Sequence, residues 1–177
     1  LAARTRRVRL GTGASLLALN DPVRVTEDVA TLDLLSGGRI EFGVARGGPF
    51  PLQYRHAGVG GADEARERML EALGLVRRFW TEATVDHEGR FHRCQGMAVE
   101  PRPLQSPVPV WLASLSPDAL QLAAREGFGL MATPSSDLAK VAAAIAPERG
   151  RGDWRFAIAR FFHCEDDHAS AVAHGLA

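Results

Sequence analysis

The sequence predicts an α/β fold in which helices cover a parallel β-sheet. Short apolar segments with the pattern of strands alternate with longer segments in which apolar residues recur at helical spacing. Repeated strand–helix–strand order requires right-handed crossovers, which make the strands parallel and leave the helices outside. The 177 residues, 46% of them hydrophobic, suffice for one ordinary domain with a buried core. We therefore expect a single domain over residues 1–177.

The N-terminal part supplies a strand, a helix and a second strand. Residues 8–13 form the first predicted strand. A helix follows, with Asp21 as its N-cap, Pro22 at its first position and Gly37 as its stop signal. Residues 39–45 alternate as the next strand. Apolar residues of the helix that should face the sheet are Val25, Val29 and Leu32.

The middle of the chain contains a loop, a long helix and a hairpin. Glycine and proline predict a loop over residues 47–61, and residues 63–82 have helical periodicity. A hairpin is expected around residues 87–90, an insertion into the strand–helix rhythm. The predicted buried face of the helix contains Met69, Leu73, Val76 and Trp80. Its predicted solvated face contains Glu64, Glu67, Arg68, Glu71 and Arg78.

The C-terminal part returns to alternating strands and helices. Predicted strands cover residues 108–113, 129–132 and 156–162. Ser116, Pro117 and Asp118 open a helix that Gly127 ends, and Leu120, Ala123 and Ala124 should lie inside. A further helix is expected from Ser136 to about residue 146.

Charge argues against nucleic acid as the main partner. Lysine plus arginine and aspartate plus glutamate both number 21, whereas phosphate binding needs a cationic excess. Arg4, Arg6, Arg7 and Arg9 come nearest to a basic stripe, and we interpret them as a solvated helix end running into a strand, with a polyanion site as the alternative. No apolar run approaches the ~20 residues of a membrane span.

The cysteines and histidines do not form a common metal pattern. Cys94 and Cys164 lie far apart, so a reduced cytoplasmic protein is the economical interpretation. Residues 163–168 contain metal-capable side chains at spacings that fit no common zinc site, and we expect a strand end followed by an acidic helix start. His87, His92 and Cys94 should face solvent on the hairpin. We expect no metal.

Other catalytic motifs are weak or missing. Residues 11–16 resemble a dinucleotide fingerprint only superficially, because the third glycine is absent and the next helix starts late. The Gly-x-Ser-x-Gly string of serine hydrolases does not occur.

Residues directly after the strands are the candidate site, because parallel α/β folds bind ligands at the carboxyl ends of their strands. The helix that opens at Ser116 presents free N–H groups to an anion, and Arg46, followed by glycine, could add a planar bidentate cation. Together they predict a phosphate site. The alternative is that Ser116 only caps its helix and Arg46 pairs with a surface carboxylate. The strand-end segments are residues 13–15, 45–47, 114–116, 133–134 and 163–164.

Four sequence blocks resemble the signature of luciferase-like monooxygenases. They are Arg9-Leu10-Gly11-Thr12-Gly13, residues 21–25 with 27–39, Gly43-Val44-Ala45-Arg46-Gly47, and the proline-rich residues 101–105 with Val110-Trp111-Leu112-Ala113-Ser114. The resemblance covers nearly the whole chain. It implies a (β/α)8 TIM barrel, incomplete here, of which this chain matches about the third to seventh strands.

The resemblance also implies a cofactor and its ligands. Reduced FMN would bind at the carboxyl-end mouth, with its phosphate held by Arg46 and by the backbone and hydroxyl at Leu115 and Ser116. Gly13 and Ala14 would form a non-proline cis peptide under the flavin ring. No catalytic residue is assigned, because the family's catalytic histidine lies on a second strand that this sequence lacks. Ala45 stands where light-emitting members have a reactive cysteine, so bioluminescence is not implied.

The implied activity is oxygenation of a small organic substrate by O2, with a separate NAD(P)H-dependent reductase supplying reduced FMN. Two alternatives stay open: hydride transfer with the deazaflavin F420, and a truncated, non-catalytic flavin-binding protein. A homodimer or a homologous subunit is expected through the helix over residues 22–36, where Val23, Ala30 and Leu34 form a second apolar strip. Five recognisable strands and a start inside what looks like a helix tail predict an incomplete barrel, inactive by itself.

Overall fold

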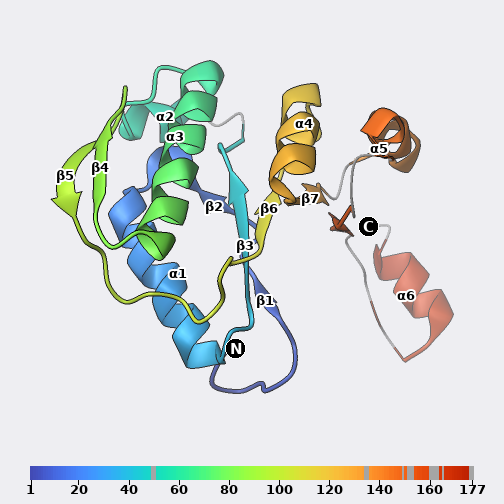
Figure 1. Ribbon diagram of the computed structural model, residues 1–177. Coiled ribbons are helices and arrows are strands. Elements are labelled where there is room, and N and C mark those ends of the chain that lie inside the picture. The colour runs from blue at the N-terminus through green and yellow to red at the C-terminus, as the bar shows by residue number, and fades with distance from the viewer. Residues whose placement is uncertain are drawn as a thin grey trace. The chain divides into compact units, whose positions relative to one another are not determined.

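The computed structural model describes residues 1–48, 51–133, 136–148, 150, 154–159, 164 and 166–175 (Figure 1). These residues form two compact units, Leu1–Ala113 and Ser114–Ala177. Each unit contains parallel strands and helices, as the sequence predicts. That the whole chain is one domain stays a prediction.

Strand β3 (Ile40–Ala45) is the centre of the sheet in the first unit. Strands β1 (Leu10–Gly11), β2 (Ser15–Leu16) and β6 (Val110–Leu112) all pair with it in parallel (Figure 1). Their carboxyl ends therefore meet at one edge of the sheet.

Two strands are shorter than predicted. The strand expected over residues 8–13 pairs only as β1, and Val8 is 55% exposed. The strand expected over residues 108–113 begins at Val110, because Pro109 has no N–H for the ladder. The predicted strand at residues 39–45 is confirmed except for its first residue, Arg39.

The helix expected after residue 21 is confirmed as α1 (Pro22–Ser36). The Asp21 carboxylate accepts hydrogen bonds from the N–H groups of Val23 and Arg24, at 2.9 and 3.0 Å. Gly37 ends the helix with a φ of 70°, a left-handed conformation that favours glycine.

The inner face of α1 departs from the prediction near its end. Val25 and Val29 are buried as expected, but Leu32 is 41% exposed. Asp33 and Ser36 take the buried positions, because their side chains accept hydrogen bonds from the backbone N–H groups of Ile40 and Arg39 at the start of β3. The helix turns polar groups inward where they have backbone partners.

Helix α3 (Ala62–Thr81) packs on α1 and carries the expected apolar face. All four residues predicted inside are buried: Met69, Leu73, Val76 and Trp80. The Trp80 ring meets Phe42 of β3 edge to face, at a centroid distance of 5.4 Å. Its indole N–H donates to the Thr26 carbonyl of α1 at 3.2 Å, so one side chain joins the sheet and both helices.

The loop expected over residues 47–61 contains a short helix, α2 (Pro51–His56). Tyr54 is buried there and contacts Ala18, Val59 and Ala65. Ala18 belongs to a short 3-10 helix, Leu17–Leu19, that follows β2. Burial of the Tyr54 ring in this small apolar cluster stabilises α2 within the glycine-rich segment.

The predicted hairpin is confirmed as β4 (Val85–Glu88) and β5 (Arg93–Met97), paired antiparallel. Its side chains are less exposed than expected: His87, His92 and Cys94 are half-buried. Cys94 packs against a cluster formed by Leu75, Phe79, Val85 and Val99. The hairpin lies on α3, and this contact covers one of its faces.

The expected helix tail at the N-terminus forms only turns over residues 2–4. The buried Arg39 guanidinium holds this segment, because it donates to the carbonyl oxygens of Ala2, Thr5 and Val8. It also donates to the Ser36 carbonyl at the end of α1. Arg9 pairs with Glu41, so the basic stripe is not a continuous cationic surface.

The second unit contains α4 (Pro117–Glu126), β7 (Gly129–Ala132), α5 (Leu138–Ile145), β8 (Phe156–Ile158) and α6 (His168–Gly175). A short 3-10 helix, Ala146–Glu148, follows α5. Strand β7 is confirmed as predicted and pairs in parallel with β8.

Three predictions for this unit have mixed outcomes. Leu120 and Ala123 are buried in α4 as expected, whereas Ala124 is half-buried. Helix α5 begins two residues later than expected, since Asp137 rather than Ser136 caps it. Positions 160–162 of the last predicted strand, Pro134 and His163 lie outside the described residues.

Within the part of the chain described here, no helix has the length and apolar content to cross a membrane.

Candidate functional site

The Gly13–Ala14 peptide bond is cis, as the resemblance implies. It lies between β1 and β2, and the residues after it pair with the end of β3, Ser15 opposite Val44 and Leu16 opposite Ala45. The bond therefore lies at the carboxyl-end edge of the sheet. Among the described residues, and apart from its two chain neighbours, no heavy atom lies within 4 Å of the position that a Cβ on Gly13 would take, so the space beside this residue is open.

Thr12 joins the residue before the cis peptide to β3. Its hydroxyl donates to the Gly43 carbonyl at 2.8 Å and accepts from the Gly43 N–H at 2.9 Å. The Thr12 hydroxyl thus continues the hydrogen bonding to β3 beyond the end of β1. Sequence reasoning assigned Thr12 no role, because a threonine after a strand carries no distinctive signal.

Arg46 follows β3 directly, at the same edge of the sheet. Its side chain is exposed, and one guanidinium nitrogen donates to the Ala62 carbonyl of α3 at 3.3 Å. No carboxylate among the described residues pairs with it, contrary to the alternative drawn from the sequence. The other N–H groups of this guanidinium can donate hydrogen bonds to an anion.

The first turn of α4 is the second element of the predicted site. Ser116 is its N-cap, and its hydroxyl accepts from the Ala119 N–H at 3.4 Å. The Ser116 N–H donates to the Ser114 hydroxyl at 3.3 Å, and Leu115 between them is half-buried. The capping role expected from the sequence is confirmed.

Arg46 belongs to the first unit, and Leu115 and Ser116 belong to the second. Convergence of the arginine and the helix start on one phosphate stays a prediction.

Glu71 of α3 holds the tip of the hairpin, although the sequence placed it on the solvated face. Its carboxylate accepts hydrogen bonds from the N–H groups of Arg90, Phe91 and His92, at 3.1, 3.1 and 2.8 Å. The His87 ring lies 3.2 Å from the same carboxylate. The helical periodicity of α3 could not reveal these partners, because they follow Glu71 by 16 to 21 positions in the sequence.

These contacts shift two pKa values. Burial alone would raise the pKa of Glu71, but the hydrogen bonds from His92, His87 and Phe91 outweigh it and hold the pKa of this carboxyl below its ordinary value. Burial lowers the pKa of His92, and the negative charge of Glu71 opposes that shift only in part. The hairpin tip thus keeps a charged carboxylate beside a histidine that favours its neutral form.

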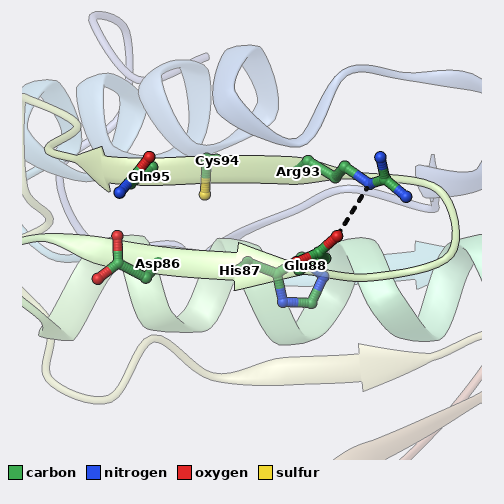
Figure 2. A pocket seen from close by; sticks show the side chains of 6 residues that line it. All are labelled: Asp86, His87, Glu88, Arg93, Cys94 and Gln95. Atoms are coloured by element: carbon green, nitrogen blue, oxygen red, sulfur yellow. Dashed lines mark ion pairs between the residues drawn. The ribbon is translucent and has the colours of Figure 1, made fainter.

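An open groove of about 630 Å³ lies on the hairpin, and Figure 2 shows the side chains that line it. All its lining residues come from the two strands: Asp86, His87, Glu88, Arg93, Cys94 and Gln95. Glu88 and Arg93 pair across its end at 3.8 Å and are 82% and 76% exposed. Because the groove does not exclude water, it lacks the dry environment that flavin oxygenation needs. We do not assign the active site there.

Parallel strands backed by helices, with an exposed arginine after the central strand, define an α/β protein of the barrel class. The family model for luciferase-like monooxygenase matches residues 1–177, and the chain belongs to this family.

Individual relatives agree. The chain is 31% identical over 137 residues to the oxygenase component of flavin-dependent trigonelline monooxygenase from Acinetobacter baylyi, covering 76% of this chain and 37% of that protein. It is 31% identical over 156 residues to F420-dependent glucose-6-phosphate dehydrogenase from Kineococcus radiotolerans, covering 86% of this chain and 45% of that protein. The chain spans less than half the length of these two curated relatives.

A solved structure extends the match to three dimensions. The crystal structure of a monooxygenase from Streptomyces bottropensis superposes with a TM-score of 0.83 and 32% identity, covering 98% of this chain and 56% of that one. The predicted fold class, an incomplete (β/α)8 TIM barrel with a hairpin insertion, is confirmed.

Proposed function

We propose that this chain is part of a flavin-dependent monooxygenase that binds reduced FMN and uses O2 on a small organic substrate. The observation that carries the proposal is the exposed Arg46 directly after β3, at the edge of the sheet where β1, β2 and β6 also end. Family membership and the similarity to a flavin-dependent oxygenase component support it.

The residues present fit FMN. An exposed arginine that pairs with no carboxylate of the described residues suits a phosphate, and the open space beside Gly13 suits a flat ring. Ser116 and Leu115 would add backbone N–H groups to the phosphate at the positive end of α4. Bound FMN would supply the activation of O2, and the protein would orient the ring and exclude water.

The relative from Acinetobacter is named as an oxygenase component. We propose by analogy that a separate NAD(P)H-dependent reductase supplies reduced FMN to this protein, and that the protein works in the cytoplasm. The chain itself would provide the binding surface and no electron source.

Arg46→Ala should weaken binding of reduced FMN by about 2 kcal/mol, or about 30-fold, because a charge-assisted contact is lost. The measurement is anaerobic equilibrium binding to the intact protein. Arg6→Ala is the matched control: Arg6 is exposed and precedes β1, at the opposite edge of the sheet, so its loss should leave the affinity unchanged. Unchanged affinity in Arg46→Ala would remove the phosphate assignment.

The second candidate is an F420-dependent oxidoreductase, favoured by the similarity to F420-dependent glucose-6-phosphate dehydrogenase. Competition between reduced FMN and F420 for the intact protein separates the two. Tighter F420 binding without oxygen uptake would favour hydride transfer, and tighter FMN binding with oxygen uptake would favour the monooxygenase.

We also propose self-association, or pairing with a homologous subunit, through α1, with corrected residues. Ala30 is fully buried and Val23 packs inside the first unit, so the predicted strip is not exposed as a whole. Leu32, Leu34 and Leu35 are 41%, 41% and 70% exposed instead.

Leu32 and Leu35 are three positions apart and share one side of the helix. Replacing both by lysine should shift the intact protein from dimer toward monomer in sedimentation at micromolar concentration, because the charges cannot be buried across an apolar contact. Gln53→Lys, which adds a lysine at an exposed position of α2 and outside α1, should leave the dimer intact. A wild-type monomer would contradict the proposal.

A further inference from the structure

The segment directly after Arg46 is anchored by a buried tyrosine. Tyr54 of α2 is 7% exposed, and its hydroxyl donates to the Gly47 carbonyl at 3.2 Å. Its ring packs against Ala18, Val59 and Ala65. The hydroxyl thus joins a packed cluster to the backbone one residue beyond the proposed phosphate ligand.

Gly47 is shaped for this anchor. Its φ of 102° lies in the region that favours glycine, and a Cβ there would lie 3.4 Å from the edge of the Tyr54 ring. A Cβ at that distance is in ordinary contact with the ring, so the backbone conformation, and not the space, makes position 47 a glycine. The turn after Arg46 and the tyrosine fit each other as a pair.

The same cluster restrains the other end of Arg46. The guanidinium donates to the Ala62 carbonyl at 3.3 Å, in the first turn of α3, and Ala65 of that turn packs with Tyr54. Both the main chain after Arg46 and the tip of its side chain are thus tied to one packed cluster. A long arginine held before binding loses less freedom when an anion arrives, which favours affinity.

We propose that Tyr54 is a positioning residue for anion recognition by Arg46, so that the preference of the protein for a phosphorylated flavin depends on the Tyr54 hydroxyl. The inference rests on the proposed function, in which Arg46 binds the FMN phosphate. Tyr54 does not touch the flavin; it acts through Gly47.

Tyr54→Phe keeps the ring and removes only the hydroxyl. Reduced FMN should bind about 3- to 10-fold more weakly to this variant, as expected for one lost hydrogen bond that positions a charged group. Reduced riboflavin, which lacks the phosphate, should bind as it does to the wild type. Gln53→Ala, an exposed polar change on the same helix, should alter neither affinity. Both flavins are titrated anaerobically into the intact protein, and urea unfolding is recorded for each variant.

The ratio of riboflavin to FMN dissociation constants separates the possible failures. An equal loss for both flavins would make Tyr54 a general structural residue and overturn the inference. If Arg46→Ala lowers the ratio and Tyr54→Phe does not, the inference is wrong and the proposed function stands. If Arg46→Ala leaves the ratio unchanged, the proposed function itself fails. In the Arg46→Ala background Tyr54→Phe should have no further effect on the ratio, and a persistent effect would show that the tyrosine acts elsewhere.

Discussion

Asp33→Ala should lower the free energy of unfolding by about 3 kcal/mol or more, because it leaves buried hydrogen-bond donors without an acceptor. The Asp33 carboxylate is fully buried. It accepts from the N–H of Ile40 at 3.3 Å, and from the backbone and side-chain N–H groups of Gln105 at 2.9 and 2.7 Å. One side chain thus joins the end of α1, the start of β3 and the segment that leads into β6.

Urea unfolding at neutral pH measures the loss. Asp28→Ala is the matched control on the same helix: its carboxylate is 58% exposed and lies 3.4 Å from Arg24. An exposed pair of this kind contributes about 0–1 kcal/mol, so the control should stay near the wild type. Equal losses in the two variants would contradict the assigned role of Asp33.

Glu71→Gln should destabilise the hairpin by about 2 kcal/mol, because a charged acceptor of several backbone N–H groups becomes a neutral amide. The amide protons of Arg90, Phe91 and His92 should then exchange faster with solvent. Glu67→Gln, on the same helix with a carboxylate that is 53% exposed, is the control and should change exchange little.

The Glu71 contact also has a defined pH dependence. Its pKa in the folded protein lies below the ordinary value of about 4.3. The stabilisation is therefore complete above that ordinary value and is lost as the pH falls through the lower pKa of the folded state. Protection of the hairpin amides in the wild type should decrease over this acid range. If Glu71→Gln shows the same acid transition at these amides, Glu71 is not its source.

Local sequence signals determined the elements and the edge where the site lies. Asp21, Gly37 and Ser116 act on backbone groups within four positions, so their capping roles follow from the chain itself. The order of strands and helices determined the parallel pairing, and the family signature around Gly13 and Arg46 indicated the cis peptide.

Only the tertiary structure decided which polar residues are buried and which segments they hold. Asp33 meets Gln105 across 72 positions, and Glu71 meets His92 across 21. Periodicity assigns a charged residue to solvent because burying a charge is costly, but that cost is offset when the fold brings backbone N–H groups to it. The burial of an aromatic residue, Tyr54, was also decided by the tertiary structure. Glycine and proline predict a loop for its segment, but the segment is helical and the Tyr54 ring is buried. Such partners are absent from the local pattern, because contacts between distant segments exist only after the chain has packed.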